Sequence, residues 1–541
     1  MNELPIITIL TLVPLVGAAI VAGVGQENKR LARALAFGVS LLSLGIALAL
    51  WKSFDTTSGL MQFEERHAWI PSLGVDYRVA VDGLGLLMVL LTAIVVPMAL
   101  MAAWNIGRAG SPLPADGAHG VTRPTEYGSH LYFSLVLFLQ AGLFGTFTAL
   151  NFFHWFLFWE LGLIPAFFLI RLWGGPRRAA ASTQFFIYTM VGSVTLLLAF
   201  VGIFLATGKM DFTELADMAR TGELTVALST KLGWSLFGHD FLAQTMPRLI
   251  FLGALLGFAV KVPLMPFHTW LPSAYSEAPS STTMLLTGLM SKMGMYGFLR
   301  ILLPIFPEQM QWLRTPLLAL AVITIVFSAC AAFAQKDLKR ILAYSSINHL
   351  GYCLLAVFAV TGSSAAILAP ATERAAALNG ALLQMFNHGL TAATLFWFIS
   401  LIEKRSGGLR GLNDFGGLRK VAPVFCGLIG IALFSSLGLP GLNGFIGEFL
   451  IFKGVFPLAP WAAALSVIGI LVTAIFILTV IQRVFNGPLN AKWATFPDLT
   501  LAERALVAIP LALMLVLGLW PQLVLGVVSA TVVRMVEQLK F

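Results

Sequence analysis

Long apolar runs recur from one end of the chain to the other, and they constrain its fold more than any other feature. Each run is about 20 residues long, the length that an α-helix needs to cross the roughly 30 Å hydrocarbon core of a bilayer. The composition agrees, because 58% of the 541 residues are hydrophobic and only 11% are charged. We therefore predict an all-α polytopic membrane protein. The fourteen predicted spans cover residues 5–23, 31–51, 81–104, 130–149, 151–173, 181–207, 245–268, 281–303, 313–334, 338–361, 376–402, 420–450, 461–485 and 504–531.

The sequence outside these runs leaves no room for a soluble domain. Two connections, 52–80 and 208–244, are long enough for surface helices or hairpins. The first run has no basic start and no obvious small-residue cleavage site, so we expect it to be kept as a span and not removed as a signal peptide.

The distribution of lysine and arginine predicts how the chain is oriented. Connections that follow odd-numbered spans carry 19 of these residues, and those that follow even-numbered spans, with the C-terminal tail, carry 13. Basic residues gather in cytoplasmic connections. We therefore expect the odd connections to face the cytoplasm of a bacterial inner membrane. Both termini would then lie on the periplasmic side.

Two predicted spans are interrupted by proline or glycine beside an ionisable residue. In span 7, Pro263 and Pro266 follow Lys261; in span 12, Leu-Pro-Gly at 439–441 precedes Glu448. Discontinuous helices at matching positions of two halves point to the ion pathway of a transporter. Spans 7 and 12 are five apart, so spans 4–8 and 9–13 would form an inverted repeat; simple proline kinks that shape packing are the alternative. The predicted divisions are spans 1–3 with their loops (1–129), the first half (130–303), the inverted second half (313–485), and span 14 with the tail (504–541).

Four charged side chains lie well inside the apolar runs: Glu160, Lys261, Lys292 and Glu448. On insertion scales each costs roughly 2.5–3.5 kcal/mol at the middle of a membrane. Pairing of opposite charges, or access to water, must offset that cost. A lysine that gains or loses an acidic neighbour can take up or release a proton. We therefore predict a proton relay, with structural ion pairs as the alternative.

Three histidines in or beside the spans could join such a relay. They are His268, His349 and His388, and imidazole exchanges protons near neutral pH. Their spacing does not match a metal site such as two histidines four residues apart. Ordinary hydrogen-bonded core histidines are the alternative for each of them.

The residues give no sign of a cofactor or of nucleic acid. The three cysteines, Cys330, Cys353 and Cys426, fit no zinc, iron–sulfur or haem signature. No glycine-rich nucleotide loop follows a strand pattern. The net charge of +9 is spread over the connections and forms no concentrated basic patch. We predict no cofactor, metal or nucleic acid bound to this chain.

Seven segments in and beside the predicted spans carry distinctive motifs. They are FHWFLFWELGLIP at 153–165, KVPLMPFHTWLP at 261–272, EAP at 277–279, KMG at 292–294, DLKRILAYSS at 337–346, QMFNHG at 384–389 and LPGLNGFIGEF at 439–449. These segments resemble the antiporter-like, proton-translocating membrane subunits of respiratory complex I, the NADH-quinone oxidoreductase. The similarity runs in unbroken order from about span 3 to span 13. The chain departs from the family pattern at Ser273 and Tyr275, where aspartate and histidine are common.

The resemblance implies a role for each ionisable residue of the spans. It implies that Glu160 tunes the proton affinity of Lys261, and that Glu448 is the terminal proton site of the second half. The residues that would hold and relay protons between them are Lys261, Lys292, His268, His349 and His388.

The resemblance also implies partners and a division of labour. Of the L, M and N types, Glu448 in span 12, the length and the short tail favour the M type. Such a chain would be a non-redox subunit of a translocase. It would lie in the lipid bilayer beside L-, N-, K-, J-, A- and H-type membrane subunits. The FMN, the iron–sulfur clusters and the quinone would belong to partner subunits.

Two other functions remain open from the sequence. One is a subunit of an Mrp-type or hydrogenase-linked cation/proton antiporter, which would exchange Na⁺ or K⁺ for protons. The other is a structural membrane spacer that has lost proton pumping.

Overall fold

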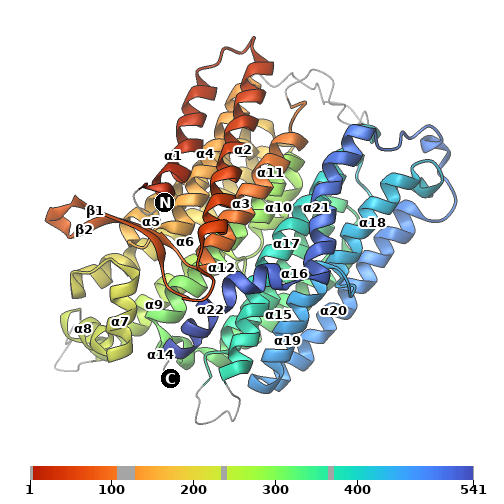
Figure 1. Ribbon diagram of the computed structural model, residues 1–541. Helices are drawn as coiled ribbons and strands as arrows, with labels where there is room; N and C mark the ends of the chain where they lie inside the picture. Colours follow the sequence, from red (N-terminus) through yellow and green to blue (C-terminus); the bar gives the residue numbers. More distant parts are fainter. Residues whose placement is uncertain (1–3, 107–127, 233–240, 363–370, 540–541) are drawn as a thin grey trace.

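A computed structural model describes residues 4–106, 128–232, 241–362 and 371–539 of the chain. This part is a bundle of largely upright helices, with one β-hairpin beside its N-terminal helices (Figure 1). Ten of the described helices are long and apolar enough to cross a membrane. Two shorter apolar helices, α1 (Ile6–Ala22) and α18 (Pro423–Leu437), add to them. The multi-spanning helical architecture that the sequence predicts is confirmed.

The N-terminal part joins the β-hairpin to the start of the first helix. Glu65 accepts the backbone N–H of Ile7 at 2.7 Å and that of Thr8 at 3.3 Å, where an α-helix leaves its first N–H groups unpaired. The hairpin occupies the predicted surface connection at 52–80. The elements here are α1, α2 (Lys29–Ser53), β1 (Gln62–Ile70), the 3₁₀ turn η1 (Pro71–Leu73), β2 (Val75–Val81), antiparallel to β1, and α3 (Gly83–Ala102).

The next part corresponds to predicted spans 4–8. Two short helices, α7 and α8, form in the predicted connection at 208–244, of which residues 233–240 lie outside the described part. Span 8 contains two π-helical segments, η2 and η3, that the sequence did not predict. The elements are α4 (Ser129–Thr148), α5 (Phe152–Trp173), α6 (Arg178–Thr207), α7 (Phe212–Thr221), α8 (Glu223–Lys231), α9 (Phe241–Lys261), α10 (Trp270–Glu277), α11 (Ser280–Leu285), η2 (Leu286–Met290), α12 (Ser291–Gly297), η3 (Phe298–Leu302), α13 (Leu303–Ile305) and α14 (Pro307–Trp312).

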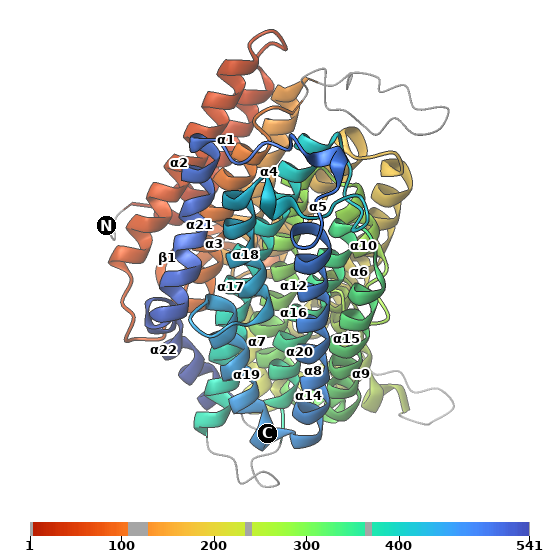
Figure 2. The same cartoon turned by 90° about the vertical axis from the view of Figure 1, so that its right-hand side faces the viewer.

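The part that follows corresponds to predicted spans 9–13. Its longest helix, α17, has 36 residues and packs against α16 and α19 as well as against α3 and α11. Helix α15 packs against α16 and α20, and Figure 2 shows these helices running upright. The elements are α15 (Arg314–Ala334), α16 (Leu338–Ala359), α17 (Ala371–Ser406), the 3₁₀ turn η4 (Leu418–Lys420), α18, α19 (Asn443–Leu458), α20 (Pro460–Val480), the π-helical segment η5 (Ile481–Phe485) and the 3₁₀ turn η6 (Ala491–Trp493).

The C-terminal part differs from the single span predicted at 504–531. It consists of α21 (Leu501–Leu519) and α22 (Gln522–Gln538), which point in different directions in Figure 1. Trp520, between them, has φ −133° and ψ 67°, outside the helical region. Proline disfavours the α conformation in the residue before it, and Pro521 follows Trp520. The apolar pattern continues across this point, so hydropathy alone could not locate the end of α21.

The helix in span 7 stops at the charged residue that the sequence singled out. Helix α9 ends at Lys261, and α10 begins only at Trp270. Across this gap, the N–H of Met265 donates to Thr324 Oγ1 at 3.1 Å, and the Trp270 indole donates to the carbonyl of Val260 at 2.9 Å. These bonds satisfy backbone groups that the interruption frees.

In span 12, α18 and α19 meet at a glycine in the left-handed region. Gly438 has φ 82° and follows α18. The side chain of Asn387 donates to the carbonyl of Asn443 at 2.6 Å, and the Ser435 hydroxyl donates to Asn443 Oδ1 at 2.5 Å. The two helix ends are thus held by side chains of α17 and α18.

Candidate functional site

The clearest cluster of ionisable residues begins at Lys292 on α12, between the two π-helical segments. Lys292 is fully buried. Its ammonium donates to the carbonyl of Thr287 at 2.5 Å and lies 2.7 Å from Nδ1 of His388 on α17. π-Helical turns inside α-helices are often found at functional sites. Two residues that the sequence predicted separately are therefore hydrogen-bonded partners.

A second hydrogen-bonded pair lies beside the first. His349 on α16 shares a hydrogen bond of 3.0 Å with Oε1 of Glu448 on α19. Its other ring nitrogen lies 3.2 Å from the Ser436 hydroxyl, and Gln384 donates to Glu448 Oε1 at 3.1 Å. The rings of His349 and His388 have centroids 5.3 Å apart. The four residues Lys292, His388, His349 and Glu448 thus form a continuous row, which we call the buried relay.

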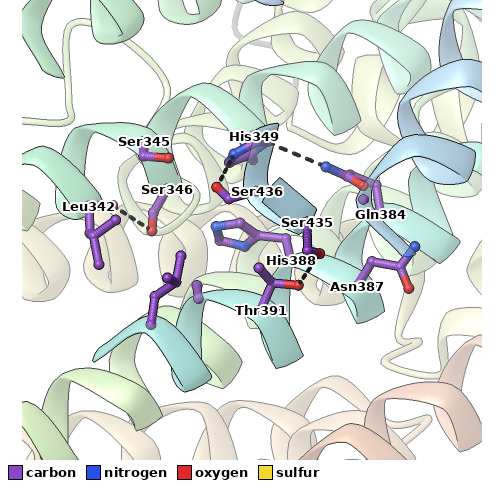
Figure 3. Close-up of a pocket in the computed structure, with 13 residues that line it drawn as sticks. Leu342, Ser345, Ser346, His349, Gln384, Asn387, His388, Thr391, Ser435 and Ser436 are labelled. Atoms are coloured by element: carbon purple, nitrogen blue, oxygen red, sulfur yellow. Dashed lines mark hydrogen bonds between the residues drawn. The ribbon is translucent and has the colours of Figure 1, made fainter. Parts of the chain in front are cut away.

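A small cavity adjoins the two histidines of the buried relay. Figure 3 shows His349 and His388 at its wall, together with the hydroxyls of Ser346, Thr391 and Ser435. Its volume is about 20 Å³, and a cavity of roughly 10–15 Å³ on this measure is enough for one water molecule. The cavity is lined by polar groups that could hydrogen-bond to such a water.

Lys261 stands apart from the buried relay. It is the last residue of α9 and is only 2% exposed. Its ammonium lies 4.5 Å from the ring centroid of Trp159, a cation–π distance. Among the described residues, no carboxylate oxygen approaches Lys261 Nζ within 4.0 Å. The negative end of the α9 dipole also favours a cation at this position.

Glu160 and His268 do not join the hydrogen-bonded row within the described part of the chain. Oε1 of Glu160, on α5 next to Trp159, is buried and accepts no hydrogen bond there. His268 lies between α9 and α10, half-buried, with Phe327 and Tyr344 as its aromatic neighbours. Glu160 is next to Trp159 in the chain, and Trp159 is the side chain that contacts the Lys261 ammonium.

The two lysines lie on helices that touch. A side chain at Gly294 would bring its Cβ within 3.2 Å of the Lys261 Cβ and 3.0 Å of the Val262 nitrogen. Glycine is therefore required here for α12 to approach the end of α9. Lys292 is two residues before this contact.

Sequence reasoning missed several residues that hold the charged groups. Trp159 and Gln384 lie within quoted motifs but carry no charge, so the search for ionisable residues passed over them. Lys339, at the edge of predicted span 338–361, was not singled out as a buried charge, yet it is 3% exposed and lies 3.2 Å from Glu403. Asp82 and Arg300 form another buried ion pair. These charges lie at the edges of predicted spans, where hydropathy does not reveal whether a side chain is buried.

Within the described ranges, no cluster of three or more potential metal ligands occurs.

Comparison with known proteins identifies the family. Residues 149–475 match the family described as "NADH:quinone oxidoreductase/Mrp antiporter, TM". NADH-quinone oxidoreductase subunit M of Mycobacterium tuberculosis is 32% identical, over 98% of this chain and 94% of the relative. F(420)H(2) dehydrogenase subunit M of Methanosarcina mazei is 36% identical, over 96% of each chain.

Solved structures share the fold over nearly the whole chain. A chain of respiratory complex I from Thermus thermophilus is 26% identical, with a TM-score of 0.80 over 99% of this chain and 100% of that one. A chain of the Mrp complex from Dietzia sp. is 21% identical, with a TM-score of 0.78 over 98% and 97%, and shows the fold alone. The chain therefore belongs to the NADH:quinone oxidoreductase/Mrp antiporter membrane family, within its subunit M branch.

Proposed function

We propose that this chain is an M-type, proton-translocating membrane-arm subunit of an NADH/quinone oxidoreductase complex. The observation that carries the proposal is the buried relay, in which Lys292, His388, His349 and Glu448 follow one another through the bundle. Two hydrogen-bonded pairs of ionisable side chains, whose histidine rings lie 5.3 Å apart at membrane depth, are suited to passing protons. The similarity to M-type subunits supplies the kind of complex.

The proton steps follow from the contacts. The ammonium of Lys292 donates a proton to His388 Nδ1 and becomes a neutral amine. The His388 ring then releases a proton to a water in the adjoining cavity, which passes it to His349. His349 donates to the carboxylate of Glu448, and each imidazole regains its neutral form once it has passed the proton on. One proton moves from Lys292 to Glu448, which is then a neutral carboxylic acid, and the two histidines are unchanged in charge.

Lys261 is a separate proton site in this scheme. The indole face of Trp159 stabilises its ammonium, and Glu160, the next residue, supplies the nearest negative charge along α5. The contact of α12 with the end of α9 at Gly294 supports water-mediated transfer from Lys261 to Lys292. His268, in the interruption of span 7, would lie on the path by which Lys261 exchanges protons.

The proposal includes a membrane topology. The pairs α9/α10 and α18/α19 act as the discontinuous spans 7 and 12 of an inverted repeat, and the whole chain makes fourteen crossings. The odd connections face the cytoplasm, and both termini face the periplasm. The bacterial inner membrane is the location.

Redox chemistry belongs to partners in this scheme. The partners are the L-, N-, K-, J-, A- and H-type membrane subunits and the subunits that hold FMN, iron–sulfur clusters and quinone. This chain contributes a translocase function driven by quinone reduction elsewhere. The alternative is an Mrp-type or hydrogenase-linked cation/proton antiporter, supported by the fold shared with the Mrp complex. Co-purification with quinone-site and iron–sulfur subunits separates the two.

The test uses Lys292→Ala and Glu448→Ala in the assembled complex in proteoliposomes. We expect proton pumping per quinone reduced to fall strongly, because each change interrupts the relay. Lys453→Ala is the control, since Lys453 lies on α19 with Glu448 but is half-exposed and paired with Glu373 at 3.5 Å. Normal stoichiometry in both test variants would contradict the proposal. Pumping that requires added Na⁺ or K⁺ would favour the antiporter alternative.

A further inference from the structure

A second charged cluster lies where α10, α11, α16 and α17 meet. Its residues lie in or beside the connections that follow odd-numbered predicted spans. The buried ammonium of Lys339 lies 3.2 Å from Glu403 Oε1 and donates to the carbonyl of Ala278 at 3.0 Å. The other oxygen of Glu403 accepts from the Ser280 hydroxyl at 2.7 Å. The Glu403 side chain is 22% exposed and Lys339 4%, so the pair connects solvent to the interior.

Two further charges lie around this pair: Arg410, in the connection after α17, and Asp337, at the start of α16. Arg410 lies 3.5 Å from Glu403 and 2.6 Å from Asp337, and it donates to the carbonyl of Ser276 at 2.7 Å. Glu403 therefore faces two cations, Lys339 and Arg410. The four charged groups, Lys339, Glu403, Arg410 and Asp337, thus lie together beside the junction between α10 and α11.

A row of hydroxyls leads inward from this pair along one helix. Ser280, Thr283, Thr287 and Ser291 are spaced three, four and four residues apart, the spacing of one helical face. All four are buried. The hydroxyl of the first, Ser280, donates to Glu403, and the backbone carbonyl of the third, Thr287, accepts from the ammonium of Lys292. We call these four residues the hydroxyl row.

Two further observations connect the hydroxyl row to proton chemistry. The Tyr275 hydroxyl is fully buried and lies close to the hydroxyls of Thr287 and Ser291, but within the described part of the chain it has no partner in direct hydrogen-bond geometry. The Thr287 hydroxyl lies 2.8 Å from that of Ser346, which lines the cavity beside His349 and His388. A buried, unpaired hydroxyl is costly unless a water pairs with it. The Tyr275 hydroxyl beside the hydroxyl row could therefore hydrogen-bond to a bridging water molecule.

From this arrangement we propose that the hydroxyl row is a proton uptake route, with Glu403 as the group that binds the incoming proton. The Glu403 carboxylate takes a proton from solvent, which weakens its attraction to Lys339. The proton then passes to the row, where each oxygen accepts one proton and releases its own to the next through bridging water. It ends on the neutral amine of Lys292, and Glu403 is again a carboxylate. This inference rests on the proposed function and adds a route that delivers protons to Lys292 without Lys261.

The sharpest variant is Tyr275→Phe, which removes one unpaired hydroxyl and keeps the ring. The matched control is Tyr132→Phe, because Tyr132 is also buried but bonds Ser281 at 2.7 Å, beside the row. In the assembled complex we expect pumping to fall roughly tenfold in Tyr275→Phe, since a positioned proton-transfer group contributes at least that much. Tyr132→Phe should pump normally. Equal pumping in the two variants would overturn the hydroxyl row as the uptake route, because the Tyr275 hydroxyl is the group that would hold its bridging water beside Thr287 and Ser291.

The ion pair is tested with Glu403→Gln, Lys339→Gln and the double variant. If the pair only holds the helices together, the double variant should recover, because two neutral amides leave no unpaired buried charge. If Glu403 binds the proton, the double variant should stay as defective as Glu403→Gln, and Glu403→Asp should recover part of the pumping. Recovery of the double variant would overturn the proposal. Normal pumping in these variants, with pumping lost in Lys292→Ala, would reject the uptake route and leave the proposed function intact.

Discussion

The ammonium of Lys292 lies 2.7 Å from Nδ1 of His388, although the two residues are 96 positions apart in the chain. They come from the two predicted halves of the chain and lie on α12 and α17. The contact joins the lysine of span 8 directly to the histidines and the glutamate of the second half. It is the step at which a proton would cross between the halves.

Removal of either partner of this contact should cost the same pumping as removal of both. We expect Lys292→Ala, His388→Ala and the double variant to show nearly equal losses, because residues that act in series are not additive. The measurement is the proton-to-quinone ratio of the assembled complex. A double variant whose loss equals the product of the single losses would show that the two residues act on separate paths.

The contact of Lys261 with Trp159 should appear as a coupling energy. In a double-mutant cycle with Lys261→Met and Trp159→Leu, we expect the two changes to be coupled by about 0.5–2 kcal/mol, the range of cation–π contacts. Unfolding of the purified subunit in detergent provides the free energies. The same cycle with Trp461, which is exposed on α20, should give no coupling.

Asn443 should be important for the junction between α18 and α19. Asn443→Ala removes the acceptor of the Ser435 hydroxyl and leaves a buried polar group without its partner. We expect the free energy of unfolding to fall by about 1–3 kcal/mol. Pumping should fall as well, because α19 carries Glu448. Asn413→Ala, in the connection after α17, is the control for stability, and equal stability of the two variants would count against this role.

Asp498 should make the start of α18 sensitive to acid. Its carboxylate accepts the N–H groups of Phe425 at 2.8 Å and Val424 at 3.0 Å, in the first turn of the helix. Burial acts to raise the pKa of Asp498, but hydrogen bonds from three backbone N–H groups and the charge of Arg504 outweigh it and hold the pKa below its ordinary value of 3.8. A lowered pKa in the folded state stabilises the protein above the unfolded pKa, and this contribution is lost as the pH falls through the folded value.

The variant Asp498→Ala should therefore lose about 0.5–2 kcal/mol of unfolding free energy at neutral pH, as other helix-capping residues do. The difference from the parent protein should shrink as the pH falls below 3.8. Unfolding as a function of pH measures both effects. Asp217→Ala, at an exposed position on α7, should show neither. A difference that does not change with pH would contradict the carboxylate as its source.

The ends of most helices could be predicted from the sequence, because the hydrophobic demand of a membrane is local. Predicted spans 1–6 end within a few residues of α1 to α6, and the hairpin falls in the connection expected to hold one. The interruptions at Pro263 and Pro440 were visible because proline and glycine act on their own backbone. The ionisable residues themselves were visible because a charge in an apolar run is costly wherever it lies.

The partners of these residues were decided by the tertiary structure. His349 and Glu448 are 99 residues apart, and no local pattern records which helix faces which. The tertiary structure placed Trp159 against the Lys261 ammonium, divided span 14 at Trp520, and buried Lys339 at a span edge. Hydropathy depends on each residue and its neighbours in sequence, whereas hydrogen bonds at membrane depth depend on how helices from distant segments pack. The sequence by itself therefore determined which charged residues must be stabilised at membrane depth. Only the packing of the helices determined which neighbouring groups stabilise each of them.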